Sequence, residues 1–320
     1  MPSDDWITLV ASGHAHPPTV LTSEALEAAV PGLSPGWLKN KLGIETRHVA
    51  APHEHIADLA AGSLSSALGR AGWVGNQLGA VVCATSFVDD VLPATASMIS
   101  RDISPTAVAF DVNAACASVP YAVATAQGLM LTQPDLDRVA VCAAERPTAW
   151  ADYQDRESSV FWGDSAGTLL LRRGGASGFR LVDVALLNDN AHPERVRVRH
   201  HGAFHHDGRY SFDQVLTLSD KVTQRVLARA GLKSSDLRAF VGHQSNPRLL
   251  VALGERLNIP WHAQWHNVSW AGNQAGAGVL TAFSLGWHQH GADLRPGDHV
   301  LLAAVGGGYS AGAILLEWLG

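Results

Sequence analysis

The sequence is poor in cysteine and in charge, and it has no long apolar run. Its three cysteines, Cys83, Cys116 and Cys142, show no C-x-x-C spacing, which argues against a disulfide framework or a zinc site and predicts free thiols. No stretch approaches the ~20 apolar residues of a membrane-spanning helix. The first residues, MPSDDWITLV, are acidic and lack the basic and apolar regions of a signal peptide. We therefore expect a cytoplasmic protein with no membrane partner.

Charged residues make up only 16% of the chain, and the net charge is -6, so the Lys and Arg excess of a nucleic-acid-binding protein is missing. Apolar residues make up 47%, which is too many for a disordered chain. A chain of 320 residues can bury a large core. We expect a compact protein, either one large domain or two closely joined halves, and no nucleic-acid partner.

Internal similarity indicates a duplicated chain. Three pairs of segments align, namely RAGWVGNQLGAVVCATS (70–86) with RAGLKSSDLRAFVGHQS (229–245), DRVAVCAAE from Asp137 with DHVLLAAVG from Asp298, and SAGTLLL from Ser165 with SAGAILL from Ser310. Each half alternates helical segments with short apolar strands, which predicts an α/β sandwich of two similar layers around a shared core. We place the halves at residues 1–172 and 173–320.

The segment from Arg172 to Arg209 interrupts the repeat and is the predicted joint. Within it, FRLVDVALL predicts a strand, whereas NDNAHPERVRVRHHGAFHHDGR has the composition of a surface loop. Its histidines do not predict a metal site, because no carboxylate or cysteine lies at ligand spacing and paired histidines in such loops usually face solvent. The same reasoning applies to His53 and His55, outside this segment. We therefore predict no metal site at any of these histidines, which are His53, His55, His200, His201, His205 and His206.

Cys116 lies among small residues in FDVNAACASVPYAVATAQGLM (110–130), after a short apolar run and before a long Ala-rich segment. Small neighbours leave room for a substrate, and the start of a helix favours a thiolate through the helix dipole and its free N–H groups. A cysteine that only packs has the same surroundings, so the spacing leaves both roles open. The duplication adds His243 and Asn273, which lie at the ends of related elements, where α/β proteins bind ligands.

Six motifs carry a family resemblance, and they occur in this order: GWLKNKLGIETRHVAAP, FDVNAACAS, FWGDSAG, GHQSNPR, AGNQAGAG and VGGGYSAGAILLEW. Together they resemble the landmarks of the β-ketoacyl-acyl carrier protein synthase III family of the thiolase superfamily, from end to end of the chain. The resemblance implies a five-layered αβαβα fold of two duplicated halves and a homodimer. It also implies a catalytic triad of Cys116, His243 and Asn273.

In such an enzyme, Cys116 attacks an acyl thioester and keeps the acyl group activated as a new thioester. The resemblance implies an oxyanion hole of the backbone N–H groups of Cys116 and Gly307. A malonyl thioester then loses carbon dioxide, and His243 and Asn273 donate to the enolate oxygen, where one preorganised donor is typically worth ~3 kcal/mol. Acyl-CoA is a substrate here, and neither a cofactor nor a metal is implied.

The resemblance also assigns residues at the entrance. Trp37 and Arg156 match the residues that lie on the two faces of the adenine of coenzyme A, and Asn246 lies where the pantetheine arm enters. Lys41 replaces the usual arginine, which keeps the charge but loses the planar fork that stacks. Arg248 is the implied contact with the acyl carrier protein.

Other positions depart from the family pattern. Ser118 stands where glycine is typical, Ser245 replaces the alanine of HQAN, and Gln274-Ala275 replaces the Thr-Ser of GNTS. Leu92 lies near the position that gates the acyl tunnel from the partner subunit. We interpret these changes as those of a relative in a specialised pathway with another starter acyl group.

Three functions are consistent with the sequence. The first is a condensing enzyme that decarboxylates malonyl-CoA or malonyl-carrier protein in fatty acid or polyketide-like biosynthesis. The second is an acyltransferase of the same fold that passes the acyl group to an oxygen or nitrogen nucleophile without decarboxylation. The third is a non-catalytic partner subunit of an active homologue, which the intact triad disfavours.

Overall fold

A computed structural model describes residues 6–199 and 202–320 of the chain. Within these residues, one nine-stranded sheet has the strand order β11-β12-β13-β8-β1-β7-β6-β4-β5. Its first five strands along the chain are β1 (Ile7–Ala15), β4 (Ala80–Ala84), β5 (Val108–Val112), β6 (Arg138–Glu145) and β7 (Ser165–Arg173). The other four are β8 (Phe179–Asn188), β11 (Leu237–Val241), β12 (His299–Gly306) and β13 (Ser310–Trp318).

The strand pairing repeats the same pattern twice. In the first set, β4 pairs with β6 in parallel, and β6 with β7 and β7 with β1 in antiparallel. In the second set, β11 pairs with β12 in parallel, and β12 with β13 and β13 with β8 in antiparallel. The two sets join only through the short pairing of Thr8 and Leu9 with Arg180 and Phe179. The predicted duplication is confirmed, while the division at 172 and 173 itself stays a prediction.

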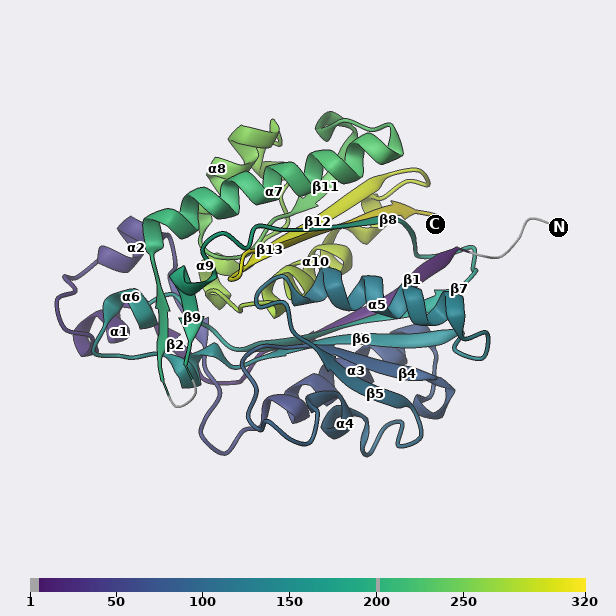
Figure 1. The fold of residues 1–320 in the computed structure, drawn as a ribbon, viewed down its shortest axis with the longest axis horizontal. Coiled ribbons are helices and arrows are strands. Elements are labelled where there is room, and N and C mark those ends of the chain that lie inside the picture. Colours follow the sequence, from purple (N-terminus) through teal and green to yellow (C-terminus); the bar gives the residue numbers. More distant parts are fainter. Residues whose placement is uncertain (1–5, 200–201) are drawn as a thin grey trace.

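Helices and strands alternate in five layers (Figure 1). The central helices α5 (Ser118–Thr132) and α10 (Ala277–His290) lie between the two sets of strands, and they are apolar on most sides because they are buried from both directions. The outer helices on one face are α3 (Ile56–Ala71) and α4 (Thr95–Ser100), and those on the other are α7 (Gly208–Ala230) and α8 (Pro247–Leu257). The predicted five-layered fold is confirmed.

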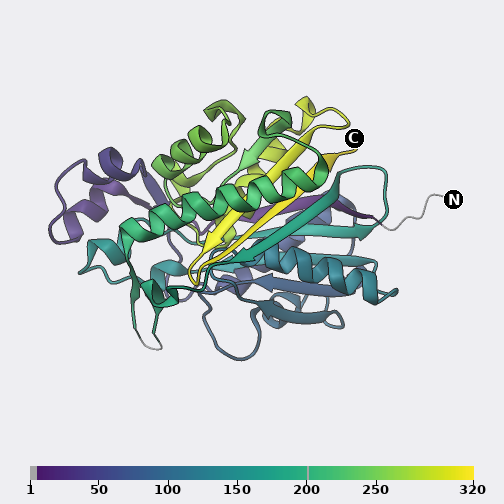
Figure 2. The ribbon, with the colours of Figure 1, turned by 45° about the horizontal axis from the view of Figure 1, so that its top comes forward.

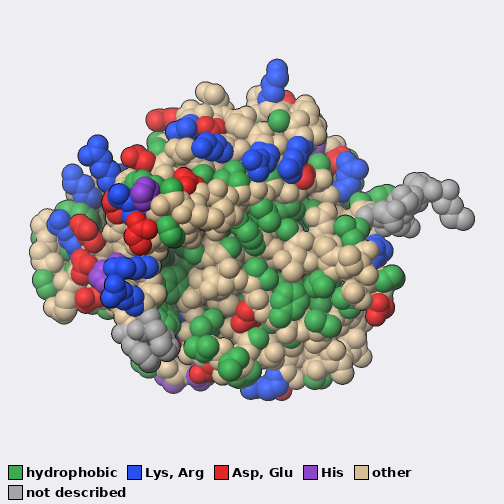
Figure 3. Space-filling model, viewed as in Figure 1, with side chains coloured by type: hydrophobic (Ala, Val, Ile, Leu, Met, Phe, Trp, Pro, Cys, Tyr) green, Lys and Arg blue, Asp and Glu red, His purple; other side chains and the backbone are tan. Residues whose placement is uncertain are grey.

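The outer helix α7 shows why the sequence separates central from outer helices. It lies across the second set of strands (Figure 2) and buries Leu218, Val222 and Val226 against them. Lys and Arg side chains lie in a row along its outer face (Figure 3). This amphipathic pattern requires one face in contact with solvent, whereas α5 contains no charged residue. No helix among the described residues is long and apolar enough to cross a membrane.

The remaining elements surround one end of the sheet. They are the strand pairs β2 (Val20–Thr22) with β3 (Thr46–His48) and β9 (Val196–Val198) with β10 (Phe204–His206), and the short helices α1 (Ser23–Ala29), α2 (Trp37–Leu42), α6 (Arg156–Ser159) and α9 (Val268–Ala271). Of these elements, α2, α6, β9 and β10 contribute residues to the walls of the cavity described below.

The predicted joint contains the strand β8, as expected, but the surface loop predicted after it is partly wrong. The strands β9 and β10 pair in antiparallel, and their residues Val196, Phe204 and His206 line the central cavity. Phe204 is only 8% exposed and packs edge-to-face on Trp162, with ring centroids 4.9 Å apart. The prediction rests on the polar residues that dominate the composition of the segment. It is partly wrong because the few apolar residues of the segment pack into the protein. The predictions for His200 and His201 lie outside the described residues.

Candidate active site

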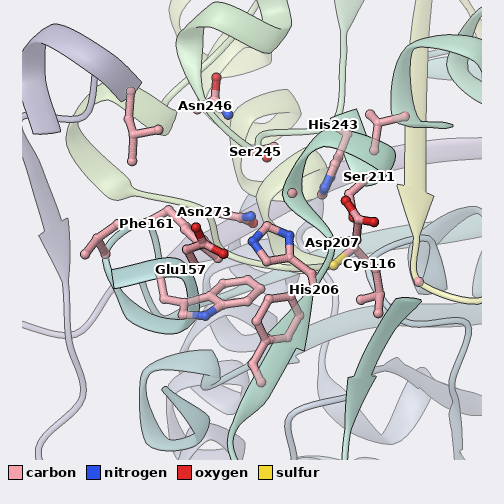
Figure 4. A pocket seen from close by; sticks show the side chains of 18 of the residues that line it. Cys116, Glu157, Phe161, His206, Asp207, Ser211, His243, Ser245, Asn246 and Asn273 are labelled. Carbon is pink, nitrogen blue, oxygen red and sulfur yellow. The ribbon is translucent and has the colours of Figure 1, made fainter. Parts of the chain in front are cut away.

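A cavity of about 670 Å³ opens at the end of the sheet where the short helices gather. Cys116, His243 and Asn273 all line it, and they come from both halves of the chain. Figure 4 shows the three side chains directed toward the same space. The structure therefore brings together the three residues that the sequence predicts to act together.

Cys116 sits in a sharp turn between β5 and α5, two residues before the first residue of α5. The preceding Ala115 has φ 51°, a left-handed conformation that costs a non-glycine residue of the order of 1–3 kcal/mol. The turn is held by Asn113 Oδ1, which accepts from Ala115 N at 3.0 Å. Ser118 Oγ also accepts from Ala114 N at 2.8 Å and donates to Ala115 O at 2.6 Å. Ser118, a departure from the family pattern, therefore stabilises the turn that presents the thiol.

Asn273 lies in a second copy of this turn. Its Oδ1 accepts from Ala275 N at 3.0 Å, and Ala275 has φ 48°. The backbone of Asn273 is fixed by Phe161 and Gly163, with Asn273 N donating to Phe161 O at 2.7 Å and Gly163 N donating to Asn273 O at 2.9 Å. Because Oδ1 is occupied by the turn, the Nδ2 end of the amide is the part that is free to donate into the cavity.

His243 follows β11 and is 5% exposed. Burial lowers its pKa to about 4, so its imidazole is neutral at pH 7. Among the described residues, its Nδ1 has no hydrogen-bond partner. The cavity therefore contains a neutral imidazole as well as the Cys116 thiol, and a neutral imidazole has one nitrogen that can accept a proton.

The thiol itself differs from the expectation of a thiolate favoured by the helix dipole. Burial, and then the carboxyl of Glu145, raise the pKa of Cys116 to about 12. A rise from 9 to 12 corresponds to roughly 4 kcal/mol, whereas a helix N-terminus contributes about 0.3–2 kcal/mol. In the free protein, burial therefore outweighs the effect of the helix N-terminus on the Cys116 thiol.

Glu145 is a site residue that the sequence analysis missed. It is the last residue of β6, is fully buried, and accepts from Ser86 N at 3.1 Å, Phe87 N at 2.9 Å and Ser86 Oγ at 3.1 Å. Burial raises its pKa to about 7, and these hydrogen bonds with that of the Gly276 N–H oppose the rise. Glu145 thus joins the loop after β4 to the start of α10, beneath Cys116. The sequence does contain a signal for Glu145, because it is a charged residue at the end of an apolar strand, where the repeat places Gly306 in the other half.

Glu145→Gln is expected to lower the free energy of unfolding by ~1–3 kcal/mol, because an amide nitrogen would face N–H donors. The native state binds the Glu145 proton more tightly than the unfolded state, so its contribution to stability falls as the pH rises from about 4.5 to about 7. The destabilisation should therefore be larger at pH 5 than at pH 8. Thermal unfolding at both pH values measures this, with the exposed Glu255→Gln as the control. Equal destabilisation at both pH values would contradict the raised pKa.

The glycines of VGGGYS lie against the Cys116 turn. A Cβ on Gly306 would lie 2.6 Å from Cys116 N, so only glycine allows this close approach. Gly307 lines the cavity beside it. The oxyanion hole predicted from the backbone of Cys116 and Gly307 stays a prediction, and both residues line the cavity.

At the cavity entrance, the Arg156 guanidinium carbon lies 5.7 Å from the centroid of the Trp37 ring. Asn246 lines the same cavity and caps α8, with its Oδ1 accepting from Leu249 N at 2.9 Å. This bond leaves the Asn246 Nδ2 free to donate. The residues predicted for the adenine and the pantetheine arm therefore border one channel.

Three other predicted residues lie outside the cavity. Lys41 is exposed on α2, and Arg248 is exposed and donates to the Asn40 carbonyl, which holds α8 to α2. Leu92 is 84% exposed and does not line the cavity of its own chain. Their predicted contacts with coenzyme A, the carrier protein and a partner subunit stay predictions.

The floor next to Cys116 is instead closed by aromatic residues of the same chain. Trp162 and Phe204 line the cavity, and Phe87 packs behind them with its ring centroid 5.4 Å from that of Trp162. Trp162 Nε1 donates to Ser158 O at 2.8 Å, which fixes the indole. Among residues 6–199 and 202–320, no group of three or more His, Cys, Asp or Glu side chains could hold a metal ion.

The five-layered fold, with a cysteine from one half meeting a histidine and an asparagine from the other, defines a condensing enzyme of the thiolase superfamily. Comparison with known proteins is more specific. Residues 110–190 match the family model of 3-Oxoacyl-[acyl-carrier-protein (ACP)] synthase III, and residues 227–318 match the model of the C-terminal part of that family. The chain belongs to the 3-oxoacyl-[acyl-carrier-protein] synthase III family, which confirms the resemblance drawn from the six motifs.

Individual relatives match over nearly the whole chain. The beta-ketoacyl-[acyl-carrier-protein] synthase III of Dinoroseobacter shibae is 31% identical over 318 residues, covering 96% of this chain and 97% of that protein. The synthase III 3 of Streptomyces coelicolor is 32% identical, covering 97% and 96%. The crystal structure of the synthase III from Pseudomonas aeruginosa has a TM-score of 0.90 at 30% identity, covering 98% and 99%. The priming ketosynthase of the R1128 polyketide pathway, at 24% identity and a TM-score of 0.88, shares the fold.

Proposed function

We propose that this protein transfers an acyl group from acyl-CoA or an acyl carrier protein to Cys116, and then joins it to a malonyl thioester with loss of carbon dioxide. The observation that carries the proposal is the meeting of a thiol, a neutral imidazole and a free amide in one cavity. The departures at Ser118, Ser245 and Gln274 favour a starter acyl group of a specialised, polyketide-like pathway over general fatty acid initiation.

In the first half-reaction, His243 accepts the thiol proton of Cys116 as the sulfur attacks the acyl carbonyl. This role rests on the meeting of both side chains in one cavity, where the neutral imidazole has a lone pair that can take the proton. The N–H groups of Cys116 and Gly307 donate to the oxyanion, the thiol of coenzyme A leaves with a proton, and the acyl group stays on Cys116 as a thioester.

In the second half-reaction, the C–CO₂ bond of the malonyl thioester breaks and its electron pair forms an enolate. The enolate oxygen accepts from Asn273 Nδ2 and from the cavity-facing N–H of His243, which requires the imidazole to exchange its proton with solvent between the two half-reactions. The enolate carbon then attacks the acyl carbonyl, and the Cys116 sulfur leaves as a thiolate that takes a proton from water. The product is a β-ketoacyl thioester.

The surroundings supply binding. Trp37, Arg156 and Asn246 receive coenzyme A and its pantetheine arm, and Lys41 adds a positive charge near them. Arg248 contacts the acyl carrier protein. The exposed Leu92 reaches the acyl site of a partner subunit in a cytoplasmic homodimer.

Cys116 is expected to be the only cysteine that becomes acylated. Cys83 and Cys142 are fully buried in β4 and β6 and do not line the cavity, whereas Cys116 does, so only the Cys116 thiol can meet an acyl thioester. Intact-protein mass spectrometry after exposure to a panel of acyl-CoAs, followed by peptide mapping, measures this. Acyl mass on Cys83 or Cys142 with Cys116 unmodified would refute the assignment.

The same experiment, extended with malonyl-CoA and malonyl-carrier protein, tests the whole reaction. Release of carbon dioxide together with a product longer by two carbons supports condensation. An enzyme that loads acyl groups and passes them to an alcohol or amine, without decarboxylation, is the alternative acyltransferase. An inactive chain that gains activity only with a homologue would be the partner subunit.

A further inference from the structure

Each of the two enolate donors is followed in the sequence by a glutamine that is completely buried. Gln244 follows His243, and Gln274 follows Asn273. Gln244 Nε2 donates to Gly242 O at 2.8 Å, and its Oε1 accepts from Asn267 N at 3.1 Å. Both ends of the Gln244 amide are therefore occupied inside the protein, away from the cavity.

Gln274 makes the corresponding contacts on the other loop. Its Nε2 donates to Asn267 Oδ1 at 3.0 Å and to Gly272 O at 3.3 Å, and its Oε1 accepts from Thr281 Oγ1 at 2.8 Å. Asn267 is thus bonded to both glutamines, through its N–H and through its Oδ1. A continuous line of buried amides joins the loop of His243 to the loop of Asn273.

The two glutamines pack closely around Gly278. A Cβ on Gly278 would lie 2.9 Å from the Gln244 Cβ and 3.6 Å from the Gln274 Cβ. Asn267 Nδ2 also donates to Thr281 Oγ1 at 2.9 Å, so the Asn267 amide is fixed at both ends. A fully satisfied buried network of this kind holds its members in one arrangement.

The duplicated turn shows that Gln274 is not needed to shape its own loop. The turn of Cys116 has the sequence Asn113-Ala114-Ala115, and that of Asn273 has Asn273-Gln274-Ala275. Both contain the same Asn Oδ1 bond and the same left-handed alanine. Since the turn forms with alanine at the central position, the side chain of Gln274 serves a contact beyond the turn.

That contact is made by a histidine from the other half of the chain. His16, directly after β1, has its Nε2 3.1 Å from Gln274 Oε1. An amide oxygen only accepts, so the imidazole carries its proton on Nε2. Burial, and then the neighbouring His48, lower the pKa of His16 to about 4, so it is neutral at pH 7 with this tautomer fixed. The ring is held by His48 and Trp270, with centroids 5.0 and 5.1 Å away.

We propose that the line from His16 through Gln274 and Asn267 to Gln244 sets the distance between the two enolate donors, and that His16 is a positioning residue for decarboxylation. The inference rests on the proposed function. It predicts that a substitution in this hydrogen-bonded line slows malonyl decarboxylation, which needs both donors, more than it slows acyl loading. Acyl loading needs only Cys116 and His243. A role in stability alone would affect both half-reactions equally.

The test compares His16→Phe with His16→Gln. Phenylalanine keeps the bulk and loses the donor, whereas glutamine places an N–H donor close to the position of the imidazole Nε2. His16→Phe is expected to lower kcat for malonyl decarboxylation about tenfold, because donors displaced by a fraction of an ångström stabilise the enolate poorly. Acyl loading of Cys116 and KM for the malonyl thioester should change less than about twofold, and His16→Gln should restore most of kcat.

Gln274→Met provides a second route if His16→Phe does not fold, because it keeps the shape and loses every hydrogen bond of the amide. It is expected to show the same split between loading and decarboxylation. The exposed His53→Phe is the control and should match the unmodified enzyme. Equal losses in both half-reactions, or no recovery with His16→Gln, would overturn the inference. An unmodified enzyme that never decarboxylates would instead overturn the proposed function, so the two failures are distinguishable.

Discussion

Cys116→Ala is expected to abolish acyl loading and condensation while the protein still decarboxylates malonyl thioesters. Removing a catalytic nucleophile costs on the order of a millionfold in the step that it performs. The enolate donors His243 and Asn273 are untouched by this change, because they lie on loops of the other half of the chain. The enolate that they stabilise would take a proton from water, so that malonyl thioester becomes acetyl thioester and carbon dioxide.

Two measurements separate these effects. Intact mass reports the acyl-enzyme, and carbon dioxide release with malonyl-CoA or malonyl-carrier protein reports decarboxylation. Cys83→Ala and Cys142→Ala are the matched controls and should still load one acyl group. Acyl loading of the Cys116→Ala protein at the unmodified rate would remove the basis of the mechanism, whatever the fate of the malonyl thioester.

The sequence predicts the fold well because the strand segments of the two halves are similar in sequence. The paired segments at Asp137 and Asp298 become β6 and β12, and those at Ser165 and Ser310 become β7 and β13. An apolar strand has the same length and neighbours in both halves, so alignment alone locates it. The number of layers came from the family resemblance, since periodicity does not specify how two halves pack.

The sequence also predicts that Cys116, His243 and Asn273 lie together, as they do in the cavity, but it does not predict the pKa values at the site. The position of Cys116 before α5 is a local property of the chain, and the structure confirms it. The pKa of the thiol depends on burial and on Glu145, which reaches the site through strand pairing and not through nearby sequence. Long-range desolvation therefore reversed an expectation that rested on a helix terminus alone.

The walls of the cavity were the least predictable part. The sequence of β9 and β10 predicts a surface loop, because its histidines and arginines outnumber the two apolar side chains, Val196 and Phe204, that line the cavity together with His206. Trp162 belongs to a recognised motif, but only its contacts with Phe87 and Phe204 show that it closes the floor. Such aromatic contacts join residues distant in sequence, so no local pattern indicates them.

Asn273→Asp isolates the role of the amide as a donor. An aspartate keeps the Oδ1 that accepts from Ala275 N, so the turn and the left-handed alanine are preserved. The change replaces only Nδ2, the end directed to the cavity, by a second acceptor. Asn273→Ala, in contrast, removes both the donor and the bond that shapes the turn.

Both Asn273 variants are expected to load Cys116 normally and to lose decarboxylation by about a hundred- to a thousandfold, the usual cost of one oxyanion donor. The aspartate variant should be at least as slow as the alanine variant, because a carboxylate would repel the developing enolate. His243→Ala should lose both half-reactions. Acyl loading needs a base for the protonated thiol of Cys116, and decarboxylation needs a hydrogen-bond donor for the enolate. Separate rates of acyl-enzyme formation and carbon dioxide release decide this. A His243→Ala protein that loads as fast as the unmodified enzyme would show that another group accepts the thiol proton, and Asn273→Asp with undiminished decarboxylation would show that the amide does not stabilise the enolate.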